Sequence, residues 1–315
     1  EVKDLKVTFQ EKNRLIRAVD GVDLAIEHGE IFGIIGESGS GKSVTGLSIM
    51  KLFGEGADMQ ASQIKLEGQD LMRLTEKEMR HIRGNKISMI FQDPMTSLNP
   101  AIKIGKQIEE SLIIHKKVTK SQAEKRVLDL MNLLAIPNPL HTRNSYPHEF
   151  SGGMSQRVMI AMALICDPVL LIADEPTTAL DVTIQAQIMD LMQELVSKLQ
   201  VSILIITHDF GVVAEMCKRV SVMYAGQIVE HASVNVLLKQ PLHPYSKGLL
   251  ECIIHLDDEK PNPKAIPGQP PDPARLPKGC RFSSRCKLKT DTCLEQMPEL
   301  KEINPGHFVR CFHHA

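Results

Sequence analysis

The stretch GESGSGKS at residues 36–43 constrains the fold of this chain more than any other feature. It follows the apolar run IFGII at 31–35 and precedes a helical pattern that begins at Lys42. A buried strand, a glycine-rich loop and a helix, in this order, form the setting of a phosphate-binding loop. The stretch therefore predicts an α/β fold with a nucleotide site at the end of a strand.

The residues of this loop have distinct expected roles. Successive backbone N–H groups turn inward at the helix N-terminus and bind an anion. Lys42 is expected to reach the β- and γ-phosphates, and the Ser43 hydroxyl to ligate Mg²⁺. A chance glycine-rich turn is the alternative, which the flanking strand and helix disfavour. The other expected nucleotide contacts are Gly36, Ser38, Gly39, Ser40, Gly41 and Val44.

An acidic pair follows a second apolar run, VLLIA at residues 169–173. Asp174 and Glu175 would lie at the carboxyl end of a parallel strand, where open α/β sheets bind ligands. Asp174 suits the Mg²⁺ shell, and Glu175 suits a general base that polarises an attacking water. Taken alone, such a pair is usually a solvated helix start, but the phosphate loop favours the functional interpretation.

Composition excludes several classes of function. Lys and Arg number 37 against 38 Asp and Glu, so no charge excess indicates a nucleic-acid partner. No apolar run reaches the roughly 18 residues of a membrane span, and the first ten residues lack the apolar core of a signal peptide. We therefore expect a cytoplasmic location, in which cysteines are reduced thiols or metal ligands.

The segment FSGGMSQR at 150–157 lies between the two predicted sites and resembles the signature motif of ABC ATPases. The order of the motifs is also that of this family, and the resemblance spans about residues 4–250. It implies an ATP-binding core of residues 1–100 and 166–240, RecA-like with an antiparallel β part. An inserted helical subdomain at 101–165 and a small cysteine-rich C-terminal extension at 241–315 complete the implied α/β fold.

The resemblance also implies roles for single residues. Gln92 would contact Mg²⁺ and water, and His208 would touch the γ-phosphate. Two such domains sandwich ATP head to tail, so that Ser151 and Gly153 contact the γ-phosphate bound to the partner chain, while Asp181 crosses toward it. Each residue also has a simpler interpretation. Gln92 could be a polar residue at a strand end, His208 a loop histidine with a hydrogen-bond partner, and Ser151 with the glycines after it a helix cap and hinge.

Two departures from the family pattern are visible. Phe150 and Met154 stand where the commonest signature has Leu and Gln, and neither position needs its side chain on phosphate. The adenine-stacking aromatic is absent from EKNRLIRAV at 11–19. Arg14, by guanidinium stacking, or Ile16 is the expected substitute.

Three further segments resemble the ATPase subunits of bacterial dipeptide/oligopeptide permeases, which include nickel importers: FQDPMTSLNP, YPHEFSGGMSQRVMIAMAL and PLHPYSKGLL. This resemblance implies an ATP-hydrolysing subunit that powers peptide import from the cytoplasmic face of the cell membrane. The implied partners are a second, related ATPase subunit (or a second copy of this chain in isolation), two permease subunits and, indirectly, an extracytoplasmic peptide-binding protein. Met95 and Leu98 could receive the permease or belong to the core. Dipeptide, longer peptide and nickel remain open as substrates.

Two competing functions are disfavoured. A soluble ABC ATPase that acts on DNA or ribosomes generally has two cassettes or a long coiled coil, and this chain has neither long heptads nor a basic block. A degenerate cassette that binds ATP without hydrolysis is disfavoured because Glu175 and His208 are both present.

Four cysteines near the end of the chain, Cys280, Cys286, Cys293 and Cys311, follow the pattern C-x5-C-x6-C-x17-C. Structural zinc sites generally contain C-x2–4-C pairs, whereas wider gaps suit a larger object such as a [4Fe–4S] cluster. A cysteine-rich extension is also a feature of the peptide-permease family. We expect a [4Fe–4S] cluster, with zinc as the first alternative and uncoordinated thiols or disulfides as the second.

Two arginines accompany these cysteines. Arg281 and Arg285 would offset the negative charge of a four-thiolate cluster, or they are simply solvated. Residues 257–315 show little apolar periodicity, so we expect this tail to fold only around a metal.

Overall fold

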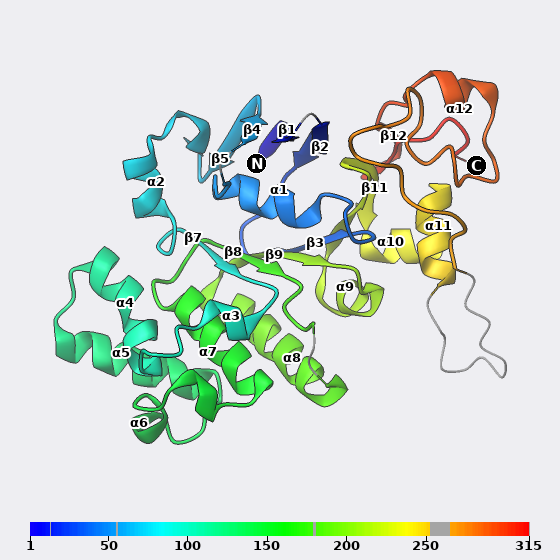
Figure 1. Ribbon diagram of the computed structural model, residues 1–315. Coiled ribbons are helices and arrows are strands. Elements are labelled where there is room, and N and C mark those ends of the chain that lie inside the picture. Colours follow the sequence, from blue (N-terminus) through cyan, green and yellow to red (C-terminus); the bar gives the residue numbers. More distant parts are fainter. Residues whose placement is uncertain (13, 55, 179–180, 253–264, 315) are drawn as a thin grey trace, which may run out of the picture. The chain divides into compact units, whose positions relative to one another are not determined.

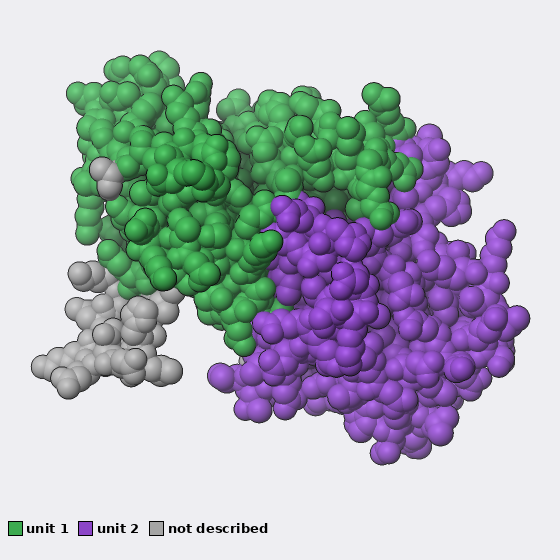
Figure 2. Space-filling model, turned by 180° about the vertical axis from the view of Figure 1, so that it is seen from behind, with its two compact units in different colours: residues 1–25, 32–73, 207–315 green, residues 26–31, 74–206 purple. Residues whose placement is uncertain are grey.

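The computed structural model describes residues 1–12, 14–54, 56–178, 181–252 and 265–314 (Figure 1). The chain divides into two compact units, green and purple in Figure 2. Unit 1 comprises Glu1–Ala25, Phe32–Arg73 and Thr207–Ala315, and unit 2 comprises Ile26–Ile31 and Leu74–Ile206. None of the helices in the described ranges has the length and apolar character that a membrane crossing requires.

Unit 1 contains an antiparallel sheet with the strand order β2-β1-β5-β6, in which β4 also pairs with β1. Apolar residues of β1 and β2 form its core, because Leu5, Val7, Val19 and Val22 are at most 1% exposed. The elements of this part are β1 (Val2–Glu11), β2 (Arg14–Leu24), β4 (Ala57–Gln60), β5 (Gln63–Leu66), β6 (Gln69–Asp70) and the 3-10 turn η1 (Leu71–Arg73).

A second series of strands in unit 1 has the order β12-β13-β11-β10-β3. Strands β10 and β3 are parallel, and the other neighbours are antiparallel. All residues of β3 are buried, as its uninterrupted apolar sequence predicts. The elements are β3 (Ile31–Ile35), α1 (Lys42–Ile49), α9 (Phe210–Met216), β10 (Arg219–Tyr224), β11 (Gln227–Ser233), α10 (Val234–Lys239), α11 (Pro244–Glu251), α12 (Asp291–Glu295), β12 (Lys301–Asn304) and β13 (His307–Val309).

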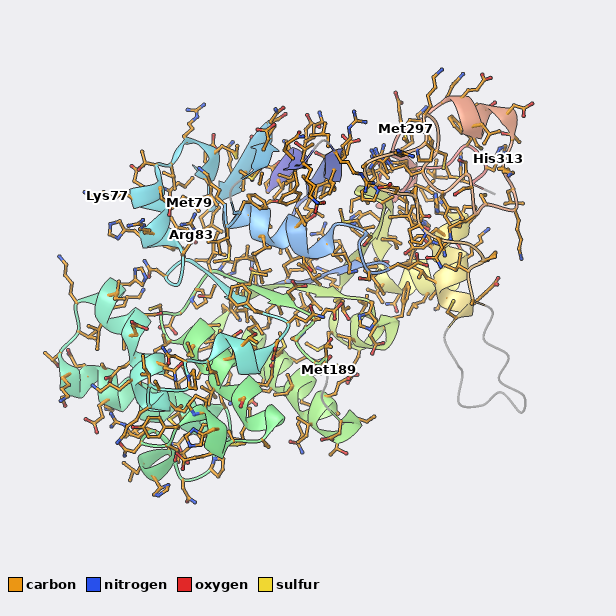
Figure 3. All side chains as sticks on the ribbon, viewed as in Figure 1. Lys77, Met79, Arg83, Met189, Met297 and His313 are labelled. Atoms are coloured by element: carbon orange, nitrogen blue, oxygen red, sulfur yellow. The ribbon has the colours of Figure 1, made fainter. Side chains whose placement is uncertain are left out.

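The C-terminal tail contributes strands to unit 1. Strand β13 pairs with β11 through Glu230↔Val309, and a turn at Gly306 joins it to β12. His307 and Glu230 form a buried pair with a 2.7 Å Nε2–Oε1 distance. The sequence interpretation, which emphasised a metal, did not predict these contacts. In Figure 3 the labelled His313 lies near the end of this tail.

Unit 2 contains the parallel strands β7 (Ile87–Ile90), β8 (Leu170–Asp174) and β9 (Ser202–Thr207), with β8 between the other two. All described residues of the three strands are buried. The remaining elements are α2 (Glu76–Ile82), α3 (Pro94–Ser97), α4 (Ile104–Lys116), α5 (Lys120–Leu133), α6 (Pro139–Thr142), the 3-10 turn η2 (Pro147–Glu149), α7 (Gly152–Leu164) and α8 (Val182–Leu199).

Local signals set the helices of unit 2. Thr119 and Gln122 form a capping box at the start of α5, and Asp181 caps α8 by accepting from the Ile184 N–H at 3.0 Å. Leu98 is 3% exposed and therefore belongs to the core, one of its two expected roles. The Met95 side chain lies outside the described parts of the structure.

Candidate functional site

The phosphate loop of unit 1 runs from the end of β3 to the start of α1, as its sequence predicts. At two of its glycines, the backbone of a neighbouring strand lies too close for a side chain. A Cβ on Gly36 would lie 2.1 Å from the carbonyl oxygen of Met223. Gly41 has φ 103°, and a Cβ there would lie 2.3 Å from the carbonyl oxygen of Ala18. The backbone can therefore pass these points only without side chains.

The loop contains buried polar groups, and one of them lacks, within the described part of the chain, a partner that a phosphate could supply. Lys42 is 5% exposed. Its ammonium donates to the carbonyl oxygens of Gly36 at 2.7 Å and Glu37 at 2.9 Å. The Ser40 hydroxyl is buried without a hydrogen-bond partner among the described residues, and Ser43 is half-buried in the first turn of α1. An unsatisfied buried donor at a helix N-terminus is the chemistry that a bound anion completes.

The other predicted contacts of the loop are more open. Ser38 and Gly39 are exposed, and no atom lies within 4 Å of the position of a Cβ on Gly39. Val44 is half-buried. The tip of the loop is therefore accessible, while its two ends are tightly packed.

Unit 2 brings together two of the predicted catalytic residues. The Gln92 amide donates to the Glu175 carboxylate at 2.9 Å, and the Thr178 hydroxyl donates to the same oxygen at 2.8 Å. Glu175 has a left-handed backbone, φ 48°, which is strained for a residue with a side chain. Asp174 is 7% exposed at the carboxyl end of β8. The carboxylate of Glu175 is therefore held in one orientation directly after the buried Asp174.

The signature segment starts helix α7. Ser151 is its N-cap and accepts from the Met154 N–H at 3.4 Å. A Cβ on Gly153 would lie 2.7 Å from Ile184, so this glycine allows α7 and α8 to start close together. Gln156, a residue that the sequence interpretation did not single out, donates to the Pro176 carbonyl at 2.7 Å. Asp181 is exposed. The signature helix is thus tied to the segment that carries Glu175.

The remaining predicted residues, His208 and Arg14, belong to unit 1. His208 is exposed between β9 and α9, next to Asp209, which caps α9 by accepting from the Gly211 N–H at 2.7 Å. Arg14 forms an ion pair with Asp272 of the tail. The predicted site residues are therefore divided between the two units. Those of unit 2 are Gln92, Ser151, Gly153, Asp174, Glu175 and Asp181.

The four tail cysteines, Cys280, Cys286, Cys293 and Cys311, line one small cavity together with His243 and Phe282. Burial raises the pKa of Cys280 to about 11 and also raises the pKa of Cys286 and Cys311. Burial lowers the pKa of His243 to about 3, which keeps this ring neutral. The Cys311 sulfur accepts from the His313 N–H at 3.3 Å. Backbone hydrogen bonds to Cys280 and Cys286 partly offset the effect of burial, but the pKa of both thiols remains raised.

No three His, Cys, Asp or Glu side chains of the described residues are arranged to hold a metal ion. Neither the expected [4Fe–4S] cluster nor the zinc alternative therefore gains support from this arrangement. None of the seven cysteines is in a disulfide. The four thiols nonetheless line one cavity, and the His313 N–H donates to the Cys311 sulfur.

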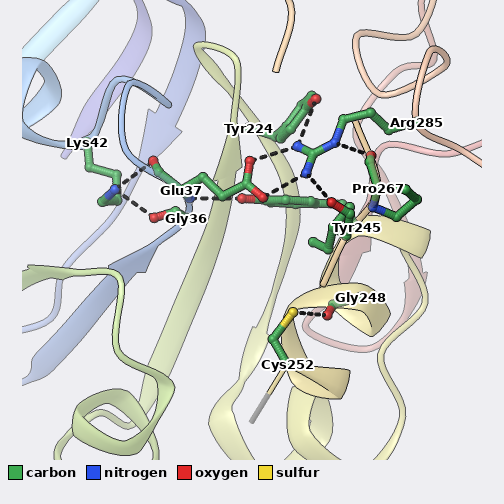
Figure 4. A network of polar contacts seen from close by, with 10 residues as sticks. Gly36, Glu37, Lys42, Tyr224, Tyr245, Gly248, Cys252, Pro267 and Arg285 are labelled. Atoms are coloured by element: carbon green, nitrogen blue, oxygen red, sulfur yellow. Dashed lines mark hydrogen bonds and ion pairs between the residues drawn. The ribbon is translucent and has the colours of Figure 1, made fainter. Parts of the chain in front are cut away.

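The two arginines of the tail are not solvated, in contrast to one of the two expectations. The side chains of Arg281 and Arg285 are each 5% exposed, and each forms an ion pair with a carboxylate far away in the sequence. Arg281 pairs with Asp20, and Arg285 pairs with Glu37 of the phosphate loop (Figure 4). Sequence reasoning missed the second contact because no pattern connects positions 248 residues apart.

The comparisons with known proteins cover both units. Residues 19–178 match the family model described as ABC transporter, and residues 229–293 match the one described as oligopeptide/dipeptide transporter, C-terminal region. The chain is 52% identical to the oligopeptide transport ATP-binding protein AppD of Bacillus subtilis, over 99% of this chain and 95% of that protein. It is 48% identical to the dipeptide transport ATP-binding protein DppD of the same organism, over 99% and 93%.

Solved structures agree with these matches. A dimeric ATP-binding cassette in a post-hydrolysis state, bound to ADP and Pi, is 27% identical and superimposes with a TM-score of 0.66. The match covers 74% of this chain and 97% of that one. The chain has the ABC ATPase cassette fold and belongs to the family of ATP-hydrolysing, ATP-binding proteins of oligopeptide and dipeptide ABC transporters.

Proposed function

We propose that this chain binds and hydrolyses ATP to power an importer of dipeptides or oligopeptides. The support is its identity, near one half, to transport ATP-binding proteins for both peptide classes. These relatives do not separate dipeptides from longer peptides. Nickel enters only through the wider family resemblance.

Phosphate binding, metal binding and proton transfer fall to different residues. Lys42 and the N–H groups of the loop would bind the phosphates, and Ser43, Gln92 and Asp174 would hold Mg²⁺, which neutralises phosphate charge when bound. Glu175 accepts a proton from the attacking water. The hydrogen bonds from Gln92 and Thr178 to one oxygen of Glu175 carry this assignment, because they orient the carboxylate beside the buried Asp174.

The complete site needs a second chain. Ser151, Gly153 and Asp181 act on the nucleotide of a related partner subunit, and His208 contacts the γ-phosphate. Arg14 or Ile16 stacks on the adenine. Ser151 suits this role because a helix N-terminus with a hydroxyl cap binds anions, and the dimeric solved relative supports the arrangement.

The assembly that we propose contains two ATPase subunits, two membrane permease subunits and an extracytoplasmic peptide-binding protein, and no nucleic acid. This chain lies at the cytoplasmic face of the membrane. Residues 101–165, which contain α4, α5 and α7, form the inserted helical subdomain. Residues 1–100 and 166–240 form the core, and 241–315 the cysteine-rich extension.

The four tail cysteines hold a [4Fe–4S] cluster with a structural role. The shared cavity and the hydrogen bonds to sulfur support it. Anaerobically purified protein is expected to be brown, with about four iron and four sulfide per chain. Colourless protein with one zinc per chain would refute the cluster.

Replacing Glu175 by Gln tests the catalytic assignment. The variant is expected to bind ATP normally and to lose hydrolysis by at least about 100-fold, because Gln cannot accept the proton of the water. Glu194→Gln, at an exposed glutamate of α8 that pairs with Lys198, is the matched control. Hydrolysis unchanged in Glu175→Gln would exclude this residue as the base.

A further inference from the structure

The C-terminal tail holds the phosphate loop through a charged side chain. Arg285 and Glu37 form a bidentate ion pair, with Nη1–Oε2 at 2.7 Å and Nη2–Oε1 at 3.0 Å (Figure 4). The Arg285 side chain is 5% exposed and the Glu37 side chain 27%. Parallel N–H···O bonds of this kind fix the relative geometry of the two groups. Both residues belong to unit 1.

Carbonyls of the tail and two aromatic rings, one of them on β10, hold the Arg285 guanidinium in place. Nε donates to the Pro267 carbonyl at 3.0 Å, and Nη2 donates to the Ile266 carbonyl at 3.2 Å. The guanidinium carbon lies 5.8 Å from the centre of the Tyr224 ring and 5.9 Å from that of Phe282. A guanidinium held by carbonyls and rings in this way is preorganised for the carboxylate.

Glu37 is held at three points. Its carboxylate binds Arg285, its backbone N–H donates to the Tyr245 hydroxyl at 2.9 Å, and its carbonyl accepts from Lys42 at 2.9 Å. Burial raises the pKa of Tyr245, so the hydroxyl stays neutral. Tyr245 lies in α11, so two of the three contacts come from residues beyond 240.

The charge of Glu37 explains why this contact matters. The Glu37 carboxylate lies in the phosphate loop, whose N–H groups and Lys42 are proposed to bind the negatively charged phosphates of ATP. Like charges repel, and the repulsion is stronger where water is excluded. Arg285 neutralises the charge of the Glu37 carboxylate and holds this side chain in an ion pair with the tail.

We propose that Arg285 is a positioning residue for ATP binding, which acts through Glu37 of the phosphate loop. This inference rests on the proposed role of the loop. It assigns to the tail a function at the nucleotide site that its cysteines alone do not indicate.

The chain contains a matched control. Arg281 has the same burial, also comes from the tail, and pairs with Asp20 and the Ala225 carbonyl, none of which belongs to the phosphate loop. If the arginines matter only because they attach the tail to the rest of unit 1, loss of either one should change ATP affinity by the same factor. If Arg285 acts through Glu37, only its loss should change ATP affinity.

The experiment compares Arg285→Met, Arg285→Lys, Arg281→Met, Glu37→Gln and the double variant Arg285→Met/Glu37→Gln in the full-length chain. ATP affinity is measured with a fluorescent ATP analogue, hydrolysis by kcat and KM, and folding by the melting temperature and iron content. Arg285→Met is expected to raise Kd and KM about tenfold with kcat within about threefold. Arg285→Lys keeps the positive charge but cannot form two parallel hydrogen bonds to the carboxylate, and it is expected to raise Kd and KM about threefold.

The remaining variants separate the explanations. Glu37→Gln and the double variant are expected to bind ATP within about threefold of the wild type, and Arg281→Met within about twofold. Unchanged affinity in Arg285→Met, equal loss in Arg281→Met, or a double variant as weak as Arg285→Met would overturn the proposal. Lys42→Ala checks the loop separately: if it leaves ATP binding unchanged, the proposed nucleotide site fails, whatever Arg285 does.

Discussion

The phosphate loop and the cysteine tail belong to the same unit, but contacts of very different range hold them. Lys42 donates to carbonyls five and six positions earlier in the chain. In the tail, Arg281 and Arg285 pair with residues 261 and 248 positions away. The loop can therefore be recognised from eight residues, whereas the tail acquires its role only when the whole unit has folded. Glu37 is the point at which the two regions meet.

Gly36→Ala tests the local side of this comparison and has the largest expected effect. A Cβ 2.1 Å from the Met223 carbonyl forces the backbone to move, which should cost about 3 kcal/mol of unfolding free energy. Chemical denaturation measures it. Gly39→Ala is the control: its Cβ meets no atom within 4 Å, so only its φ of +76° matters and the cost should be about 1 kcal/mol. Equal costs would show that the loop is less tightly packed than the structure indicates.

Cys286→Ser tests whether the tail and the loop are coupled. Cys286 directly follows Arg285, so the loss of one ligand of the proposed cluster should loosen the segment that presents the guanidinium. We expect a lower iron content and ATP affinity weaker by about fivefold, which corresponds to about 1 kcal/mol. Isothermal titration with ATP and iron analysis measure the two effects.

Cys252→Ser is the matched control, because Cys252 is exposed and lies outside the cavity of the four cysteines. It should change neither quantity. A Cys286→Ser protein that has lost its iron but binds ATP like the wild type would show that the tail cluster and the loop are independent.

Local patterns predicted most of the fold. The apolar run at 31–35 and the glycines after it predicted β3, the loop and the start of α1, because each depends on near neighbours. Asp174 and Glu175 appear at the predicted strand end for the same reason. The hairpin β12–β13 was missed, although Asn304-Pro305-Gly306 is a turn signal between two short runs.

Side-chain contacts were harder to predict. The motifs assigned both Gln92 and Glu175 to the nucleotide site, but they did not predict the hydrogen bond between the two side chains. Thr178, the second donor to Glu175, was not recognised. Arg285 and Tyr245 carry no local signal, since their partner in the loop lies more than 200 positions away. Periodicity describes which face of an element is buried, and it does not specify which distant charge a buried arginine meets.

Asp272→Ala has the smallest expected effect and shows which tail contacts matter. Asp272 pairs with Arg14, but both side chains are about half exposed, so the loss should cost about 0.5 kcal/mol or less. Asp20→Ala is the contrasting variant: it leaves the guanidinium of Arg281 buried without its carboxylate, which should cost about 2 kcal/mol. Thermal denaturation compares the two. Equal destabilisation would mean that burial does not distinguish the tail contacts, and the proposed importance of the buried Arg285 would lose its physical basis.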